Sequence, residues 1–155
     1  RGEKVAVMAT PLTLHEEKFK QLVKRYENLA TIIPVPCPDL VEYVEKGILE
    51  GPELEGYLKD VLTPCLQEGV KAVVLGCTHF PLVKAAIGKV VGEAVRIYDG
   101  GEGTARQAKC LLAAKNLCTD QEKGHICFES SAPKKEAYYE ALYRKAAHID
   151  SRVKL

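Results

Sequence analysis

Residues 72–79 read AVVLGCTH, and this stretch decides the fold. Its first four residues form a short, Val-rich apolar run, which is typical of a parallel strand buried on both faces. Gly76 then allows the backbone to turn or to approach a ligand closely. Cys77 is therefore expected at the carboxyl end of a buried strand, where open α/β sheets bind their ligands. A thiol, a hydroxyl and an imidazole follow one another from Cys77 to His79, which predicts a proton-transfer site.

The rest of the chain alternates strand-like apolar runs with amphipathic helical patterns. Strands are expected at residues 4–10, 31–37, 71–77 and 95–98, with a short fifth strand at 125–128. Helices are expected at residues 14–27, 38–46, 53–67, 81–91, 101–116 and 134–148. This alternation implies right-handed βαβ crossovers, and therefore an α/β fold with a parallel sheet flanked by helices. Pro34 and Pro36 favour either an edge position for the second strand or an early transition of this strand into a loop.

The composition is that of an ordinary globular protein, with 155 residues of which 46% are hydrophobic and 28% are charged. The formal net charge is +1 and no charge block occurs, so electrostatic binding to nucleic acid or to a membrane surface has no support. No apolar stretch approaches the roughly 20 residues that span a bilayer. No signal peptide is recognisable, and we therefore expect a cytoplasmic protein.

The six cysteines contain no CxxC pair and no common zinc spacing, so no metal site is predicted. In a chain without a secretion signal, thiols are expected to be reduced and mostly buried. Cys65 illustrates this, because it closes an apolar helical stripe that begins at Leu54. The glycine-rich segment 100–104 lacks the spacing and the lysine of phosphate-binding loops, which argues against a nucleotide site.

Polar side chains follow three of the expected strands, at the edge where the carboxyl ends of parallel strands meet. They are Thr10 and Thr13 after the first strand, Cys37 and then Glu45 after the second, and Cys77, Thr78 and His79 after the third. Threonine hydroxyls can bind a carboxylate, and a glutamate side chain can accept hydrogen bonds from an ammonium group. Together these residues suit an amino acid as the ligand.

Simpler interpretations remain open for each of these residues. A cysteine at a strand end is more often a small buried side chain, and a single histidine is more often structural than catalytic. Glu45 follows Glu42 at helical spacing, which a solvated helix face explains equally well. Thr10 fits an ordinary strand end, and Thr13 fits the N-cap of the next helix, in a capping box with Glu16.

Four segments give the chain a family resemblance. Residues 75–82, LGCTHFPL, resemble the second cysteine motif of the glutamate racemases, within the aspartate/glutamate racemase superfamily. Residues 9–13, ATPLT, resemble the threonine-rich strand end of those enzymes. Residues 37–45 resemble their CPxFVxLVE segment, and residues 98–105 resemble the segment where the chain crosses between two domains. The four segments occur in family order.

The resemblance implies a cofactor-independent isomerase that interconverts L- and D-glutamate and supplies D-glutamate for bacterial peptidoglycan. It implies two similar α/β domains with glutamate between them, and one cysteine from each domain on opposite sides of the α-carbon. One thiolate removes the α-proton and the opposing thiol returns a proton. The residues carried over by position are Cys77 as one acid/base group assisted by His79, then Thr10, Thr13 and Thr78 for substrate polar groups, and Glu45 near the substrate ammonium or His79.

The resemblance corresponds to the carboxyl-terminal portion of the family. The opening Asp-Ser motif and the first cysteine motif, Cys-Asn-Thr, have no counterpart in this sequence. Residues 1–98 would be the second domain, carrying Cys77, and residues 99–155 would be the returning segment that completes the first domain. We therefore expect a partial enzyme that is inactive alone. Residues 99–155 should expose apolar helix faces, and formation of a homodimer is one way to cover them.

Three rival interpretations stay open. The first is another racemase of the superfamily, acting on aspartate or a hydantoin, and the second is a non-catalytic binding module derived from a racemase half. The third is a thiol-dependent hydrolase, which would need Cys77 paired with a base that a third group holds, together with an oxyanion hole. His79 lies close to Cys77 in the sequence, which is awkward for such a triad.

Overall fold

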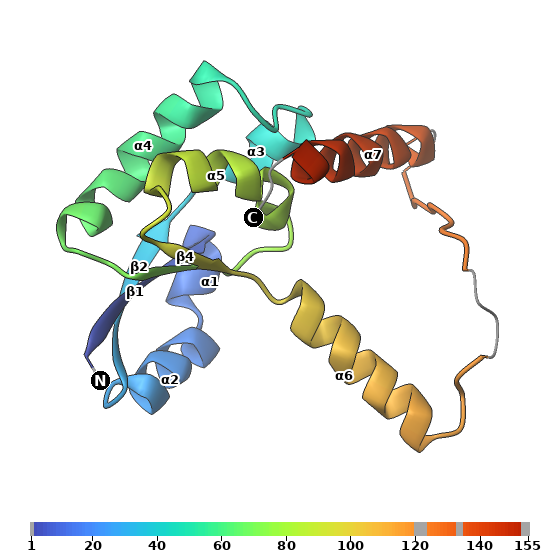
Figure 1. The fold of residues 1–155 in the computed structure, drawn as a ribbon, viewed down its shortest axis with the longest axis horizontal. Helices are drawn as coiled ribbons and strands as arrows, with labels where there is room; N and C mark the ends of the chain where they lie inside the picture. Colours follow the sequence, from blue (N-terminus) through green and yellow to red (C-terminus); the bar gives the residue numbers. More distant parts are fainter. Residues whose placement is uncertain (1, 120–123, 133–134, 153–155) are drawn as a thin grey trace. The chain divides into compact units, whose positions relative to one another are not determined.

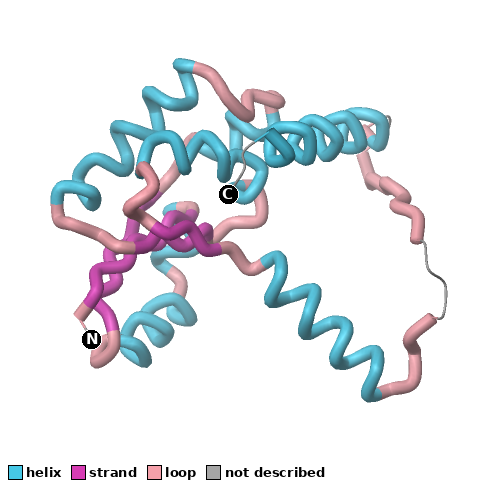
Figure 2. The backbone as a smooth tube through the Cα atoms, viewed as in Figure 1, coloured by secondary structure: helices cyan, strands magenta, loops and turns pink. Residues whose placement is uncertain are grey.

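The computed structural model describes residues 2–119, 124–132 and 135–152 (Figure 1). The chain forms two compact units, one containing Arg1–Asp99 with Ala146–Leu155 and the other containing Gly100–Lys145. The strands all lie in the first unit, and the described part of the second unit holds helices and loops (Figure 2). Within the described ranges, no helix is long and apolar enough to cross a membrane.

A four-stranded parallel sheet forms the centre of the first unit, in the order β2-β1-β3-β4. Its strands are β1 Glu3–Ala9, β2 Ala30–Pro36, β3 Ala72–Leu75 and β4 Arg96–Tyr98. β1 pairs with β2 along its whole length, and on its other side Val5 lies opposite Ala72 and Met8 opposite Leu75. The predicted parallel sheet is confirmed, and so is the edge position of the proline-containing strand β2.

Helices cover both faces of this sheet. They are α1 Pro11–His15, α2 Glu17–Tyr26, α3 Leu40–Glu45, α4 Pro52–Gln67, the 3-10 helix η1 Phe80–Val83, and α5 Lys84–Val91. The chain steps from β1 to β2 in one direction and from β2 through β3 to β4 in the other, so right-handed crossovers place the helices on opposite faces. Accordingly, α4 and α5 pack together on one face, with α1 and α2 on the other (Figure 1).

The core of the first unit lies between the sheet and the apolar faces of its helices. β1 and β3 contribute Met8 and Val73, whose side chains are fully buried. Helix α4 begins with Pro52 in its first turn and buries one stripe, formed by Leu54, Leu58, Leu62 and Cys65. The predicted core position of Cys65 is therefore confirmed, and the stripe fixes α4 against the sheet.

Gly76 is required by close packing at the end of β3. Its N–H donates to the carbonyl oxygen of Met8 at 2.8 Å. A Cβ at this position would lie 2.9 Å from that same oxygen and 3.3 Å from the Cβ of Ala9. Any side chain would therefore push β3 away from β1, so glycine is needed for the close approach of two strands.

Cys37 directly follows β2, and its thiol is part of the core. The side chain is fully buried, and Sγ donates to the carbonyl oxygen of Val35 at 3.5 Å. Burial raises the pKa of the Cys37 thiol to about 12, and the neighbouring Cys65 and Cys77 raise it as well. Cys37 is therefore a buried, protonated side chain.

Two local predictions are wrong. The helix expected at residues 14–27 starts earlier and breaks at Glu16, because Thr10 and Pro11 start α1 and Glu16 then takes an extended conformation. The fifth strand expected at residues 125–128 does not form, since these residues have no regular structure and Ile126 is 63% exposed. A short apolar run forms a strand only where another strand is available to pair with it.

Helices form at both places where they were expected beyond β4. They are α6 Gly101–Ala114 and α7 Glu136–Arg152. The first residues of α6 are the glycine-rich segment, which therefore belongs to a helix start. All residues of α6 are exposed.

We predict that Gly76→Ala lowers the free energy of unfolding by about 1–3 kcal/mol, because the added methyl group collides with the backbone of β1. Urea denaturation monitored by far-UV circular dichroism measures the change. Gly56→Ala is the matched control, since nothing lies within 4 Å of a Cβ there and the position is inside α4. The control should gain roughly 0.5–1 kcal/mol. Equal effects of the two substitutions would contradict the close-packing argument.

We also predict that the free energy of unfolding falls as the pH rises above 9.0, the ordinary pKa of a cysteine thiol. Above this pH the unfolded chain releases the Cys37 proton, whereas the folded chain keeps it until about pH 12. Urea titrations at several pH values, for the original chain and for Cys37→Ala, measure the slope. The slope should be smaller in Cys37→Ala, and identical slopes would show that Cys37 does not titrate abnormally.

Candidate functional site

Three strand ends meet at one edge of the sheet because β1, β2 and β3 are parallel. The N–H of Cys37 donates to the carbonyl oxygen of Ala9 at 2.9 Å, which ties the end of β2 to the end of β1. The bond from Gly76 to Met8 ties the end of β3 to β1 from the other side. These bonds place Thr10 and Cys77 after neighbouring strands at the carboxyl edge.

Cys77, His79 and Glu45 form a continuous series of side-chain contacts at this edge. The Sγ of Cys77 lies 3.8 Å from Nδ1 of His79, and Nε2 of His79 lies 3.0 Å from Oε1 of Glu45. The His79 and Glu45 side chains are 31% and 36% exposed, and Cys77 is half-buried. Because a carboxylate only accepts hydrogen bonds, the contact with Glu45 assigns a ring proton to Nε2 of His79, and Nδ1 then faces the thiol.

Buried residues next to Glu45 and His79 in the sequence hold the series in place. Glu45 is the last residue of α3, whose Val44 is buried, so the chain turns Glu45 away from the core. Phe80 is fully buried directly after His79, and its N–H donates to the carbonyl oxygen of Cys77 at 3.2 Å. The loop after β3 is therefore fixed at both of its ends, and the imidazole is held between the thiol and the carboxylate.

Thr10 and Thr13 form a second polar pair. Their Oγ1 atoms are 2.9 Å apart, and Oγ1 of Thr10 also accepts a hydrogen bond from the N–H of Thr13 at 3.4 Å. Thr10 is thus the N-cap of α1, and Thr13 lies inside that helix. The alternative that Thr13 and Glu16 form a capping box is wrong, because the helix starts three residues earlier with Thr10 as its cap.

Thr78 lies between Cys77 and His79 and is exposed. Within the described residues, no side-chain hydrogen bond joins it to the other predicted site residues. The structure therefore brings the predicted residues together as a Cys77–His79–Glu45 series and a Thr10–Thr13 pair. Glu45 contacts His79, as one of its two expected roles requires, and its expected place near a substrate ammonium stays a prediction.

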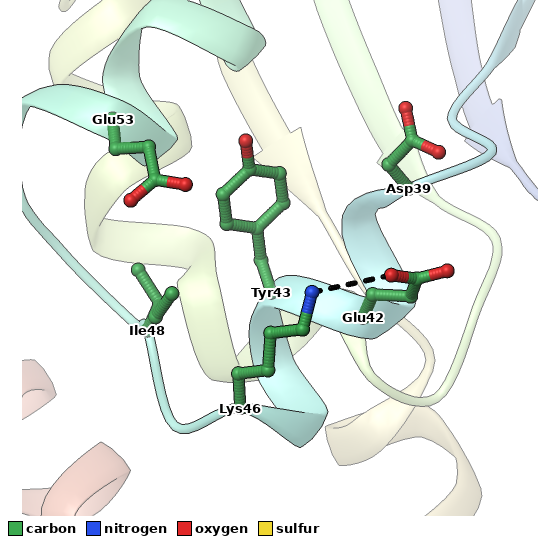
Figure 3. A pocket seen from close by; sticks show the side chains of 6 residues that line it. All are labelled: Asp39, Glu42, Tyr43, Lys46, Ile48 and Glu53. Atoms are coloured by element: carbon green, nitrogen blue, oxygen red, sulfur yellow. Dashed lines mark hydrogen bonds and ion pairs between the residues drawn. The ribbon is translucent and has the colours of Figure 1, made fainter.

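A separate pocket of about 150 Å³ lies along α3 and the start of α4 (Figure 3). Its lining residues are Asp39, Glu42, Tyr43, Lys46, Ile48 and Glu53. Lys46 donates to Glu42 at 3.3 Å, so one of the three carboxylates is paired. No sequence pattern predicts this pocket, because its residues are ordinary surface residues that the turn between two helices brings together.

The groups that the structure brings together at this edge are a thiol, an imidazole and a carboxylate. Among the described residues, no group of three or more His, Cys, Asp or Glu side chains is arranged to hold a metal ion. A carboxylate can orient an imidazole beside a thiol, and such a series is suited to proton transfer. The same series also occurs in enzymes that use the thiol as a nucleophile. The geometry alone therefore defines the chemical groups and leaves the reaction class to comparison with relatives.

The chain resembles known proteins along most of its length. It is 46% identical over 123 residues to the glutamate racemase of Clostridium kluyveri, which covers 79% of this chain and 48% of the relative. The Escherichia coli glutamate racemase structure, described with L-glutamate and the activator UDP-MurNAc-ala, is 28% identical with a TM-score of 0.71, covering 92% of this chain and 55% of that chain.

The fold is shared more widely than the sequence. The Francisella tularensis glutamate racemase structure, described with D-glutamate, has a TM-score of 0.76 at 23% identity, covering 92% of this chain and 54% of that chain. The chain thus spans about half the length of the relatives it matches. The sequence profile described as Asp/Glu/Hydantoin racemase matches residues 1–108, which include β1 to β4 and the series Cys77–His79–Glu45. The chain therefore belongs to the Asp/Glu/Hydantoin racemase family.

Proposed function

We propose that this chain is the carboxyl-terminal portion of a glutamate racemase, and that Cys77 is one of the two thiols that move the α-proton of glutamate. The observation that carries the proposal is the series Cys77–His79–Glu45 at the carboxyl edge of the sheet. The 46% identity to the Clostridium kluyveri glutamate racemase supports glutamate as the substrate. The Escherichia coli relative, which is described with L-glutamate, supports it as well.

In the proposed reaction, the Cys77 thiolate removes the α-proton of one glutamate enantiomer, and its thiol donates a proton to the carbanion formed from the other. The ordinary pKa of a thiol lies close enough to neutral pH for a cysteine to act both as acid and as base. Nδ1 of His79 faces Sγ and is placed to take up and return the thiol proton. Glu45 keeps the imidazole in this orientation through Nε2.

The threonines supply the polar contacts in this proposal. The hydroxyls of Thr10 and Thr13 are hydrogen-bonded to each other and each has one proton, so a carboxylate of glutamate accepts from both when it replaces this mutual hydrogen bond. Thr78 is exposed next to the thiol, where its hydroxyl is free to reach a substrate held at Cys77. Removal of the α-proton requires the substrate to be held in one orientation, because a misplaced α-carbon loses the proximity that the reaction needs.

Inversion of the α-carbon requires a second proton donor on the opposite side of the substrate, because a single thiol returns the proton to the side from which it came. Cys37 does not fit this role. It lies on the same sheet edge as Cys77, its side chain is fully buried, and burial raises its pKa to about 12. We therefore propose that the opposing thiol belongs to the part of the racemase that this chain does not match.

The domain assignment is part of the same proposal. Residues 1–98 would form the domain that carries Cys77, and residues 99–155 would belong to the domain that supplies the opposing thiol. The parallel sheet β1 to β4, with helices on both of its faces, supports the assignment of residues 1–98 to one domain. Aspartate is the alternative substrate, since the family description includes it, and competition between L-aspartate and L-glutamate separates the two.

We predict that the 155-residue chain alone does not racemise glutamate. The measurement is circular dichroism of L-glutamate incubated with the purified chain, whose signal should stay constant. A loss of signal that Cys77→Ser abolishes would overturn this expectation, because it would show that one thiol site suffices.

We predict further that a chimera becomes active when the unmatched amino-terminal part of the Clostridium kluyveri enzyme is joined ahead of residue 1. In this chimera, Cys77→Ser should lower kcat by about 10²–10⁴-fold, since it removes an acid/base group. Glu45→Gln should cause a smaller loss, because it keeps the shape but removes the charge that holds His79. Cys110→Ser is the control, since Cys110 is an exposed thiol of α6. Full activity of the Cys77→Ser chimera would exclude the proposed role.

A further inference from the structure

The segment that follows the thiol is held by polar side-chain contacts at both of its ends. At one end, Nε2 of His79 lies 3.0 Å from the carboxylate of Glu45. At the other end, Nζ of Lys84 donates to Oδ2 of Asp99 at 2.9 Å, the length of a charge-assisted hydrogen bond. We call residues 79–84 the anchored segment, and it contains η1 and the first residue of α5. The contact with Glu45 belongs to the site, whereas the ion pair with Asp99 joins residues outside it.

Backbone hydrogen bonds connect the two ends of the anchored segment to each other and to the thiol loop. Three N–H groups donate to carbonyl oxygens three residues earlier: Phe80 to Cys77 at 3.2 Å, Leu82 to His79 at 3.1 Å, and Lys84 to Pro81. Each of these bonds overlaps the next along the chain. The segment therefore behaves as one short, stiff piece, in which a displacement of Lys84 is passed back to His79.

The position of Lys84 is not explained by helix stability. Lys84 is the first residue of α5, and a positive charge is unfavourable there because the amino end of a helix dipole is itself positive. Lys89, in the last turn of the same helix, has the favourable placement. The carboxylate of Asp99 gives Lys84 a partner that offsets this unfavourable placement.

Asp99 places the second anchor at the same edge of the sheet as the site. It directly follows β4, which pairs with β3 so that Tyr98 lies opposite Val74. The two strands are parallel, so the chain leaves both of them at the carboxyl edge. Lys84 and Asp99 both belong to the first unit, and their contact is internal to that unit.

We propose that Lys84 and Asp99 are positioning residues of the site, whose ion pair fixes the far end of the anchored segment. This contact keeps the His79 imidazole between the Cys77 thiol and the Glu45 carboxylate. Both residues act through His79 and not on the substrate. The inference rests on the proposed function for the identity of the reaction, whereas the contacts themselves are the same for any reaction at this site.

The test uses substitutions of two lysines of α5 in the 155-residue chain. Lys84→Met removes the charge and keeps the length of the side chain, and Lys84→Arg keeps the charge. Lys89→Met is the matched control, because Lys89 donates to Glu55 of α4 at 3.2 Å and lies outside the anchored segment. Hydrogen exchange measures the protection of the Phe80 and Leu82 amides, and nitrogen NMR of the imidazole measures the environment of His79.

Lys84→Met should speed the exchange of these two amides by about fivefold or more, because opening of the segment no longer breaks the ion pair. It should move the His79 ring signals in the direction in which Glu45→Gln, the loss of the first anchor, moves them. Lys84→Arg and Lys89→Met should leave the exchange and the ring signals nearly unchanged. The control is strict, because Lys89→Met also removes a charge that is favourable for α5, which Lys84→Met does not.

Two results in the 155-residue chain would overturn the positioning role. The first is an equal effect of Lys84→Met and Lys89→Met on the two amides, and the second is an Lys84→Arg variant as loose as Lys84→Met. If Lys84→Met does not fold by far-UV circular dichroism, Asp99→Asn gives the same comparison from the other member of the pair, and unchanged exchange in that variant would also refute the role.

The kinetic test uses the chimera with the unmatched amino-terminal part of the Clostridium kluyveri enzyme. Lys84→Met should lower kcat by about tenfold, because a displaced His79 no longer serves the thiol. KM should stay within about twofold, since Thr10 and Thr13 lie on another segment. An Lys84→Met chimera that retains full kcat would overturn the proposal. An inactive parent chimera, with the expected exchange in the chain alone, would refute only the proposed function.

Discussion

The position of the Cys77 thiol depends on how closely β1 is held between its two neighbours. The bond from Cys37 to Ala9 joins one neighbour to β1, and the bond from Gly76 to Met8 joins the other. At the second of these contacts the two strands leave no space for a side chain, so the residue before Cys77 has to be glycine. The constraint is steric, and it fixes where the chain leaves the sheet. Cys77 follows immediately, so the same contact fixes the starting point of the site.

The chemistry of the site comes from a series of groups and not from the cysteine alone. His79 contacts the thiol through one ring nitrogen and Glu45 through the other, which fixes the direction in which a proton is able to move. Such a series supports acid/base chemistry and nucleophilic chemistry equally well. Membership of the Asp/Glu/Hydantoin racemase family favours the first. The burial of Cys37 then explains why two cysteines at one sheet edge do not make a two-thiol site.

Much of the fold follows from local sequence patterns, and the exceptions share a physical cause. The stripe that ends at Cys65 predicts which face of α4 is buried, and the prolines of β2 predict that this strand lies at an edge. Both predictions succeed because each signal lies within a single element. The series that includes Glu45 and His79 joins residues 34 positions apart, so only the packing of α3 beside η1 selects this contact. The run at residues 125–128 has strand-like composition but lacks a partner strand, and pairing is not encoded within the run. The early start of α1 shows that Thr10 and Pro11 compete successfully with the capping box farther along the chain.

The prolines of β2 have a consequence for the free margin of the sheet. The N–H of Cys37 points toward β1. The N–H groups of successive residues point to alternate sides of a strand, so those of residues 34 and 36 would point away from β1, and both of these residues are proline. Proline has no N–H to offer, and an incoming chain finds two of its hydrogen-bonding partners missing on this side. The margin formed by β2 is thereby protected against unwanted strand addition, the step by which exposed sheets begin to aggregate.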